Sequence, residues 1–397
     1  MTKRPNHLRF EQRWTRERQD GTRDNQNIFS KRGECAMAEG SFSGSGFQCP
    51  LPLSSSDTIQ LAHGGGGRLM RQLITELFLP QFRHTGETSE GLREPPHDSA
   101  EIRLGDGTRM AFTTDSFVVS PLFFPGGDIG KLAVFGTVND LAMSGAKPLW
   151  LSAGFILEEG LPLDTLRRVV QSMRQAAEEA GVRIITGDTK VVDRGKGDGI
   201  YINTTGLGWI PENVHISPSR IRPGDKILLS GDVGRHGIAI MSVREGLQFD
   251  NALPSDCAPL HRVVRAMVKR AADAIHCLRD LTRGGLASAL NELAMDAHVA
   301  MVINEQAIPV EPAVAAACEL LGLDPYYVAN EGRFVAVVRA DAAEELLAVL
   351  REQAGCTSAQ IIGEVQPAPA GVVELRTALG GSRVLDLLSG EQMPRIC

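Results

Sequence analysis

The last residue of the chain is a cysteine, Cys397, at the tip of a short tail that begins at Gln392. A thiol at a free chain end can move between sites, and its thiolate form is a strong nucleophile. An ordinary thiol, with a pKa near ~8.5, is only a few per cent ionised at neutral pH and needs activation. Taken alone, Cys397 is equally compatible with a covalent carrier and with an incidental thiol on a frayed end.

Aspartates recur beside predicted strands and glycines. Asp115 ends a predicted strand at residues 110–114, Asp188 follows a predicted strand at residues 183–186, and Asp140 lies on a predicted helix. Asp98 and Asp280 complete the candidate set. Hard cations such as Mg²⁺ take carboxylate oxygens and commonly keep substrate phosphates as further ligands, so several aspartates brought together would suit a metal and nucleotide site. Each aspartate alone equally suits a helix cap or an Asx turn.

Four consecutive glycines at residues 64–67, flanked by His63 and Arg68, precede a predicted helix at residues 69–78. Exposed backbone N–H groups and the helix dipole attract anions at such a point. The loop lacks the Gly-Lys-Ser/Thr ending of a P-loop and forms no dinucleotide fingerprint. A flexible linker remains an alternative, and the flanking His63 and Arg68 favour phosphate contact.

Alternating strands and helices must position these residues. One helix is strongly marked, at residues 163–180, by apolar residues at helical spacing, Asp164 near its start and Gly181 as its stop. The other elements expected in the first half are strands at residues 110–114, 149–157 and 201–210 and a helix at residues 130–144. The second half is expected to contain strands at residues 226–230 and 334–338, a helix at residues 258–274 and a helix start at residues 280–285.

This pattern predicts an α/β (α+β) fold of two domains. The predicted division is a disordered extension at residues 1–58, a first domain at 59–210, a connector at 211–224, a second domain at 225–375 and a C-terminal region at 376–397. The extension is polar and basic, with nine Lys and Arg against five Asp and Glu in residues 1–36.

Composition narrows the class of protein. The net charge of -7 argues against a general nucleic-acid binder, and no apolar run approaches the ~18 residues of a membrane span. Seven cysteines, odd in number and without a CxxC pair, support neither a disulfide framework nor a zinc cluster. The chain is therefore expected in the reducing cytoplasm.

Seven motifs together resemble one family. They are IQLAHGGGGRLM (residues 59–70), FTTDSFVVSPLFFPGGDIGKLAVFGTVNDLAMSGAKP (112–148), GFILEEGLP (154–162), ITGDTKVV (185–192), DLTRGGLA (280–287), ANEGR (329–333) and PRIC (394–397). The chain resembles the HypE family of hydrogenase maturation factors, which are carbamoyl dehydratases of the superfamily of aminoimidazole ribonucleotide synthetase and selenophosphate synthetase. The terminal cysteine separates this family from its superfamily relatives.

The resemblance implies a reaction and partners. The terminal cysteine would receive a carbamoyl group from the carbamoyltransferase HypF, and the enzyme would dehydrate it to a thiocyanate with ATP. The nitrile would pass as cyanide to iron held by HypC and HypD, for the [NiFe]-hydrogenase centre. A homodimer, with first domains that bind ATP and pair their sheets, is also implied.

The resemblance further implies roles for individual residues. Cys397 would be the acceptor, with Lys190 and Glu331 beside the reacting group and Glu331 as general base. The Mg²⁺ ligands would be Asp98, Asp115, Asp140 and Asp280. The phosphate or nucleotide contacts would be His63, Gly64, Gly65, Gly66, Gly67, Arg68, Asn139, Asp188, Arg283 and Gly284.

Three other functions stay open at this point. A superfamily kinase or synthase that activates a free small molecule would share the aspartates and glycines and would not need Cys397. A maturation scaffold without catalysis would use the tail only for docking and would tolerate loss of Lys190 and Glu331. A purely structural ATP-binding scaffold would bind nucleotide without turnover.

Overall fold

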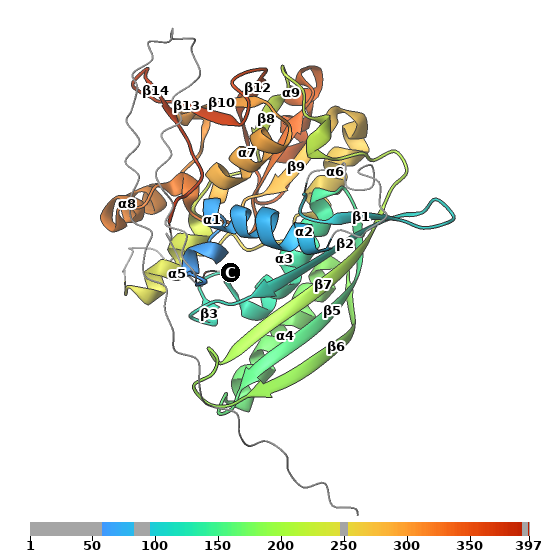
Figure 1. Cartoon of the computed structure of the whole chain (residues 1–397), viewed down its shortest axis with the longest axis vertical. Helices are drawn as coiled ribbons and strands as arrows, with labels where there is room; N and C mark the ends of the chain where they lie inside the picture. Colours follow the sequence, from blue (N-terminus) through green and yellow to red (C-terminus); the bar gives the residue numbers. More distant parts are fainter. Residues whose placement is uncertain (1–57, 83–95, 247–252, 391–395, 397) are drawn as a thin grey trace, which may run out of the picture. The chain divides into compact units, whose positions relative to one another are not determined.

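The computed structural model describes residues 58–82, 96–246, 253–390 and 396. The chain divides into two compact units, residues 1–55 and 56–397, and every described residue lies in the second. The extension predicted for residues 1–58 falls outside the described residues except for Thr58, and so does Cys397. Two large sheets with packed helices make up the described part (Figure 1).

The first sheet has five strands in the order β1-β2-β7-β5-β6 (Figure 1). They are β1 (Ala100–Arg103), β2 (Arg109–Phe117), β7 (Ile200–Ile210), β5 (Lys147–Glu158) and β6 (Arg183–Val192). Neighbours are antiparallel except β5 and β6, which are parallel. Buried and more exposed residues alternate along β2 and β7, because successive side chains of a strand point to opposite faces. One face of this sheet is therefore covered and the other is open in this chain.

The second sheet has seven strands and is covered on both faces. Its order is β14 (Ser382–Val384), β13 (Val372–Arg376), β10 (Ala300–Asn304), β12 (Gln360–Gln366), β8 (Lys226–Leu229), β11 (Phe334–Val338) and β9 (Ile275–Asp280). Every residue of β11 is buried. Val335 and Val337 pack with α7 (Gly285–Asp296), and the alternate residues of the strand pack with α6 (His261–Ala271) and α9 (Ala343–Arg351). A strand buried on both faces reads as a continuous apolar run, as this one does.

Helix α3 (Ile129–Met143) joins the two sheets. Its first turn is capped by Asp128, whose Oδ1 accepts hydrogen bonds from the backbone N–H groups of Gly130 and Lys131. Thirteen of its fifteen residues are buried, because it contacts β2 and β7 as well as β9 and α6. A helix that is buried on nearly every side belongs in a core. The few polar residues of α3 can therefore contact residues of both sheets.

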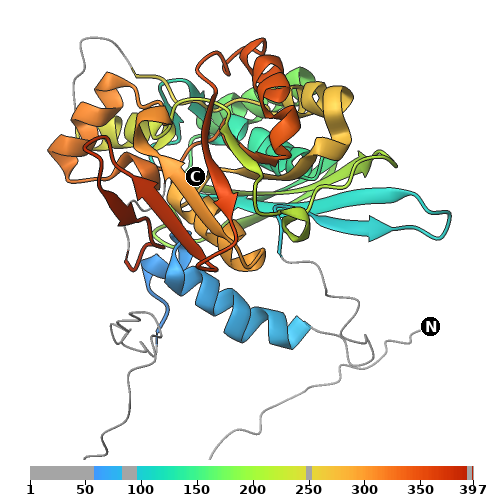
Figure 2. The same cartoon turned by 90° about the horizontal axis from the view of Figure 1, so that it is seen from above.

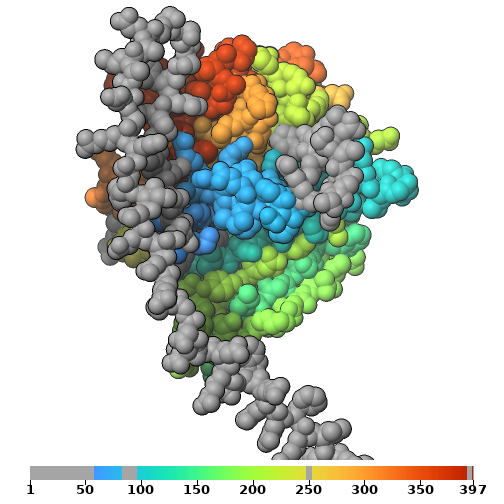
Figure 3. Space-filling view, in the orientation of Figure 1, coloured from blue at the N-terminus to red at the C-terminus, as the bar shows by residue number. Residues whose placement is uncertain are grey.

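Further helices complete the described part. Helix α4 (Leu163–Ala180) packs beside α3. A helical run on the surface, blue in Figures 2 and 3, consists of α1 (Arg68–Gln72), the π-helical turn η2 (Leu73–Phe78) and α2 (Leu79–Phe82). The remaining elements are α5 (Arg235–Arg244), α8 (Pro312–Leu321), the hairpin β3 (Phe123–Phe124) and β4 (Gly127–Asp128), and the 3₁₀ turns η1 (Leu61–Gly64), η3 (Pro218–Arg220), η4 (Ala272–Ala274), η5 (Glu305–Ala307), η6 (Pro325–Tyr327) and η7 (Ala340–Ala342). Across the described ranges, no helix combines the length and apolar character needed to cross a membrane.

Two predicted strand ends were wrong. Asp115 lies inside β2, which continues to Phe117, and Asp188 lies inside β6, which continues to Val192. Polar residues in both strands suggested that the strands ended there, but pairing with β7 and β5 extends the ladders through them. The surrounding sheet, and not local propensity, decides where these strands end.

Candidate active site

Four of the predicted aspartates converge around α3. Asp115 is on β2, Asp140 on α3 and Asp280 at the end of β9, and Asp98 precedes β1. The Thr113 hydroxyl lies 2.8 Å from Asp140 Oδ2 and 3.0 Å from the Asp98 carbonyl oxygen. The backbone N–H of Asp280 points to Asp98 Oδ2, with N and O 3.4 Å apart. Contacts of α3 with both β2 and β9 are what bring these carboxylates together.

The carboxylates of this cluster raise one another's pKa. Burial, followed by the charges of Asp280, Asp115 and Asp98, raises the pKa of Asp140 well above its usual range. Burial and the neighbouring Asp98 raise the pKa of Asp280 to about 8. Burial also raises the pKa of Asp115, and the guanidinium of Arg283 opposes this effect. Such a concentration of like charges is typical of a site that binds a cation or a cationic complex.

Two arginines accompany the cluster. Arg279 Nε lies 3.0 Å from Asp98 Oδ1, and its guanidinium also pairs with Glu292. A terminal guanidinium nitrogen of Arg283 lies 3.6 Å from Asp115 Oδ1, and the Arg283 side chain is partly exposed. Arg279 therefore holds Asp98 in place, while Arg283 can exchange its longer contact for an anionic ligand.

The donor chemistry fits a divalent cation that arrives with phosphate. In the part of the chain that the structure describes, no three His, Cys, Asp or Glu side chains form a ready metal site. Mg²⁺ usually takes only one or two protein carboxylates and completes its shell with water and phosphate oxygens. Asp98, Asp115, Asp140 and Asp280 supply the oxygen ligands that such a cation prefers.

The glycine loop packs directly against Arg283. Gly66 has φ of +73°, and a Cβ there would lie 2.4 Å from the Arg283 carbonyl oxygen. Arg283 in turn donates to the carbonyl of Gly64, at 3.4 Å. The loop of residues 63–68 and the Arg283-Gly284 pair, predicted separately, thus lie side by side and next to Asp280. The side chain of Arg68 bonds to Asp386.

Replacement of Gly66 by alanine is expected to lower the free energy of unfolding by about 1–3 kcal/mol, the cost of a strained backbone conformation. The added methyl would also collide with the Arg283 carbonyl. Gly65→Ala is the matched control, because its nearest neighbouring atom is 3.7 Å away and its φ is −88°. Urea unfolding of both variants checks this; equal stability would show that the loop does not depend on its contact with Arg283.

The side chain of Asn139 forms hydrogen bonds to backbone groups inside the protein. Its Nδ2 donates to the carbonyls of Ala258 (3.1 Å) and Glu331 (3.3 Å), and its Oδ1 accepts from the backbone N–H of Leu260 (2.8 Å). Both amide protons and one oxygen lone pair are therefore occupied. Asn139 thus fixes the segment that carries Glu331, and its predicted nucleotide contact stays a prediction.

Glu331 is a buried carboxyl with an unbonded oxygen. Its side chain is 3% exposed, and its Oε1 has no hydrogen-bond partner among the described residues. Burial, then the charges of Asp280, Asp115 and Asp256, raises the pKa of Glu331 well above its usual range. Asp256 also accepts the backbone N–H groups of Glu331 and Gly332, at 3.2 and 3.1 Å. A fixed, desolvated carboxyl of this kind is suited to proton transfer.

Lys190 and Asp188 do not join this cluster within one chain. The pair is bonded at 2.7 Å and exposed on β6, three strands away from β2, or roughly 14 Å at usual strand spacing. Asp188 shares a cross-strand row with Ser116, through Gly154 and Asn203. Since Ser116 and Asp115 point to opposite faces, the sheet separates Asp188 and Lys190 from the carboxylates.

The end of the chain approaches the site through Ile396. This residue is buried, forms an antiparallel bridge with Val119 just beyond β2, and offers its carbonyl to Nε2 of His236. Cys397 is the next residue and lies outside those that the structure describes.

Sequence reasoning missed the residues that hold the site in place. These are Thr113, His236, Asp256 and Arg279. Arg279 adjoins Asp280 and could have been noticed as its neighbour. The others carry no local signal, because their partners are between 15 and 160 positions away in the chain.

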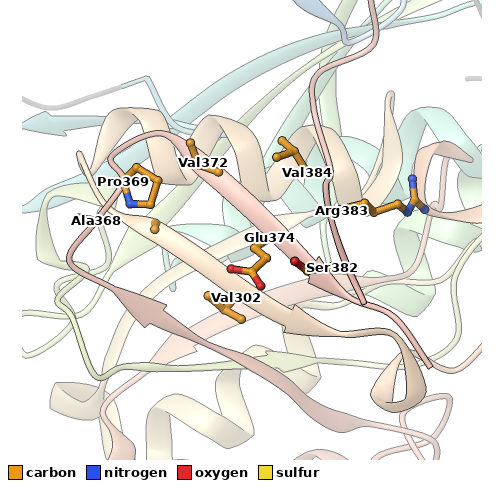
Figure 4. Close-up of a pocket in the computed structure, with 9 residues that line it drawn as sticks. Val302, Ala368, Pro369, Val372, Glu374, Ser382, Arg383 and Val384 are labelled. Carbon is orange, nitrogen blue, oxygen red and sulfur yellow. The ribbon is translucent and has the colours of Figure 1, made fainter. Parts of the chain in front are cut away.

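A cavity of about 220 Å³ lies elsewhere, on the outer part of the seven-stranded sheet (Figure 4). Val302, Val372 and Val384 line it with Glu374, Ser382 and Arg383, and no predicted site residue is among its lining. The carboxylate cluster and this cavity are therefore separate features.

The fold and the site define a class of protein. Residues 96–210 match the N-terminal domain of AIR synthase related proteins, and residues 222–376 match the C-terminal domain. The predicted two-domain α/β fold is confirmed by this match.

More similar relatives narrow the class to one family. The chain is 54% identical over 352 residues to the carbamoyl dehydratase HypE of Cupriavidus necator, which covers 89% of this chain and 98% of that protein. A chain from a HypE-HypF complex is 46% identical, with a TM-score of 0.73 over 80% of this chain and 99% of that one. HypE in complex with ATP is 50% identical, with a TM-score of 0.71 over 86% and 100%. The chain belongs to the carbamoyl dehydratase HypE family of hydrogenase maturation enzymes, as its motifs predicted.

Proposed function

We propose that this enzyme uses ATP to dehydrate an S-carbamoyl group on Cys397 to a thiocyanate, whose nitrile becomes a cyanide ligand of the [NiFe]-hydrogenase iron. One observation carries the proposal. Glu331, with its unbonded oxygen, is coupled electrostatically to Asp115 and Asp280, and Ile396 is seated beside the strand that carries Asp115. A base, a carboxylate cluster suited to a cation and the residue before the acceptor thiol therefore share one region.

The reaction requires the carbamoyl oxygen to become a leaving group. Transfer of the ATP γ-phosphoryl group to that oxygen gives ADP and an activated imidate. The C–O bond then breaks, phosphate leaves with the oxygen, and the nitrogen gives up its protons as the C≡N bond forms. Glu331, desolvated and held by Asp256 through its backbone, is placed to accept a proton from nitrogen.

The acidic cluster would hold Mg²⁺ through Asp98, Asp115, Asp140 and Asp280. A cation there supplies charge neutralisation for the transferring phosphoryl group. Arg283 and the loop of residues 63–68 would contact the phosphates, since they already adjoin one another and Asp280. Binding of the cation would relieve the mutual repulsion of the buried aspartates.

Partners and location follow from the family. HypF, found with HypE in a solved complex, would deliver the carbamoyl group, and a HypC and HypD complex would receive the cyanide. Cys257, Cys277, Cys318 and Cys356 are free and buried, as suits the reducing cytoplasm.

A homodimer would pair the open faces of the five-stranded sheets. Phe112, Ile156 and Trp209 lie on that face and are 39–45% exposed. Exposed apolar residues gathered on one sheet face commonly mark an association surface. Lys190 and Asp188 share this face, so a catalytic or nucleotide role for either depends on the second copy.

Replacement of Ile156 by lysine is expected to shift the protein from dimer to monomer, because a charge would enter the apolar surface between copies. Sedimentation velocity at several concentrations measures this directly. Val170→Lys, at a similarly exposed apolar position on α4, is the control and should keep the wild-type mass. A wild-type protein that sediments as a monomer would rule out this pairing.

The function is tested by mass spectrometry of the C-terminal peptide after incubation with HypF, carbamoyl phosphate and Mg-ATP. The Cys397 peptide should first gain one carbamoyl group and then lose the elements of water. The second step should stop with a non-hydrolysable ATP analogue. An unmodified peptide beside an active HypF would favour a scaffold or a free small-molecule substrate instead.

A further inference from the structure

His236 is a buried histidine that contacts the end of the chain. It lies in the first turn of α5, and its ring stands edge-on to Phe124 with 5.5 Å between ring centroids. Nδ1 is 2.8 Å from Ser255 Oγ, and Nε2 is within hydrogen-bond distance of the Ile396 carbonyl oxygen. Both ring nitrogens are thus engaged, by residues from two different parts of the chain.

The Ile396 carbonyl defines the tautomer of His236, because a carbonyl only accepts and Nε2 must therefore donate. The backbone N–H of Cys257 donates to Ser255 Oγ at 3.1 Å, so the hydroxyl proton is available to Nδ1. An accepting Nδ1 leaves the ring proton on Nε2, which donates it to the Ile396 carbonyl. Burial lowers the pKa of His236, which agrees with a neutral ring.

The side chain of Ile396 is a second anchor of the chain end, because it is buried in the apolar core. It is 5% exposed and belongs to the apolar cluster that contains Val119, Phe124 and Ile240. Its bridge to Val119 sets it beside the extension of β2, the strand that carries Asp115. One peptide unit, about 3.8 Å between Cα atoms, joins Ile396 to Cys397, so fixing the first limits the reach of the second.

We propose that His236, oriented by Ser255, is a positioning residue that holds the chain end at Ile396 and so presents the Cys397 thiol to the active site. The proposal rests on the carrier role of Cys397. The contact acts as a latch made of one hydrogen bond and one buried side chain. Its strength sets how the chain end divides between the docked position and free positions in which the thiol can meet a carbamoyl donor.

Thiol alkylation tests the latch without turnover. Iodoacetamide is added to the full-length protein, and the rate at Cys397 is followed by mass spectrometry of the C-terminal peptide. His236→Leu is expected to raise this rate about 10-fold, the upper range for loss of one hydrogen bond that leaves a carbonyl unpaired. His236→Gln, which keeps an N–H donor, should restore a rate within about 2-fold of wild type.

Two further measurements distinguish release of the chain end from a general loss of packing in the protein. Ile396→Ala changes only the chain end and should accelerate alkylation of Cys397 as His236→Leu does. The buried Cys257 is followed in the same digests and should stay protected in every variant. Equal acceleration at Cys257, or unchanged Cys397 rates in His236→Leu and Ile396→Ala, would overturn the proposal.

Single-turnover dehydration of S-carbamoylated protein extends the test to function. Alkylation follows the fraction of free chain ends and dehydration the fraction of docked ones, so a change in the docking equilibrium is divided between the two rates. His236→Leu should slow dehydration as far as the docked fraction falls, and His236→Gln should recover it, with ATP affinity unchanged in both. Because alkylation requires neither ATP nor HypF, a failure of the proposed dehydration would leave the alkylation result intact. An undisturbed dehydration rate in His236→Leu, together with an unchanged alkylation rate, would contradict the positioning role alone.

Discussion

Replacement of Cys397 by alanine is expected to reduce carbamoyl acceptance and thiocyanate formation to the uncatalysed background, while Mg-ATP binding stays at the wild-type level. The variant has no thiolate to attack the donor, whereas Asp115, Asp140 and Asp280 are contributed by β2, α3 and β9. Calorimetric titration with Mg-ATP and mass spectrometry of the C-terminal peptide measure the two effects separately.

Cys318→Ala is the matched control for this result, because Cys318 is a free cysteine buried in a different cluster, with α8. It should accept the carbamoyl group normally at Cys397. If Cys397→Ala still consumed ATP at the wild-type rate with a diffusible carbamoyl compound, the terminal thiol would not be the acceptor. The small-molecule kinase or synthase would then be the better description.

Replacement of Glu331 by glutamine is expected to lower the single-turnover dehydration rate by about 10²–10⁴-fold, the usual contribution of a positioned general base. Glutamine has nearly the same shape and cannot accept the nitrogen proton. In the wild type the rate should rise with pH as Glu331 ionises, and because its pKa is raised, this rise should lie above the usual range of a glutamate. The variant should lose that pH dependence.

The same substitution is expected to stabilise the folded protein at neutral pH. The folded-state pKa of Glu331 is above the value of 4.5 in the unfolded chain, so its favourable contribution is complete below pH 4.5 and is lost as pH rises toward the folded-state value. Glutamine stays neutral and avoids this loss. The melting temperature should therefore rise at pH 7, by about 2–4 °C for each kcal/mol, and match the wild type near pH 4.5.

Glu352→Gln, at an exposed glutamate just after α9, is the control for both effects and should change neither the rate nor the melting temperature. If Glu331→Gln kept full dehydration activity, a group other than Glu331 would be the base. A lower melting temperature at neutral pH would show that Glu331 is ionised and satisfied in the fold, contrary to its unbonded oxygen.

Elements with a complete local pattern were predicted well. The helix expected at residues 163–180 is α4, because its apolar stripe and the left-handed Gly181 that ends it are both local features. The strand expected at residues 334–338 is β11, whose apolar run reflects burial on both faces. Strands whose polar residues continue a ladder, such as β6, were cut short because pairing partners over thirty residues away extend them.

The site residues divide in the same way. Motifs in the sequence predicted Cys397, Glu331, the aspartates and the glycine loop as site residues, since each carries its chemistry in its own side chain or backbone. Which of them meet is a property of packing. Asp98 and Asp280 are 182 positions apart and come together through the contacts of α3, whereas Asp115 and Asp188, both on one sheet, are kept apart by its two faces.

The sequence by itself determined the family and the α/β class, because these depend on residue types and short-range spacing, and it predicted the reacting groups. Only the tertiary structure decided that Asn139 supports the segment of Glu331, that Glu331 is desolvated with an oxygen unbonded by any described residue, and that His236 meets the carbonyl of Ile396. Burial, pKa and hydrogen-bond partnership depend on which distant segments pack together, and no local pattern of residues encodes that.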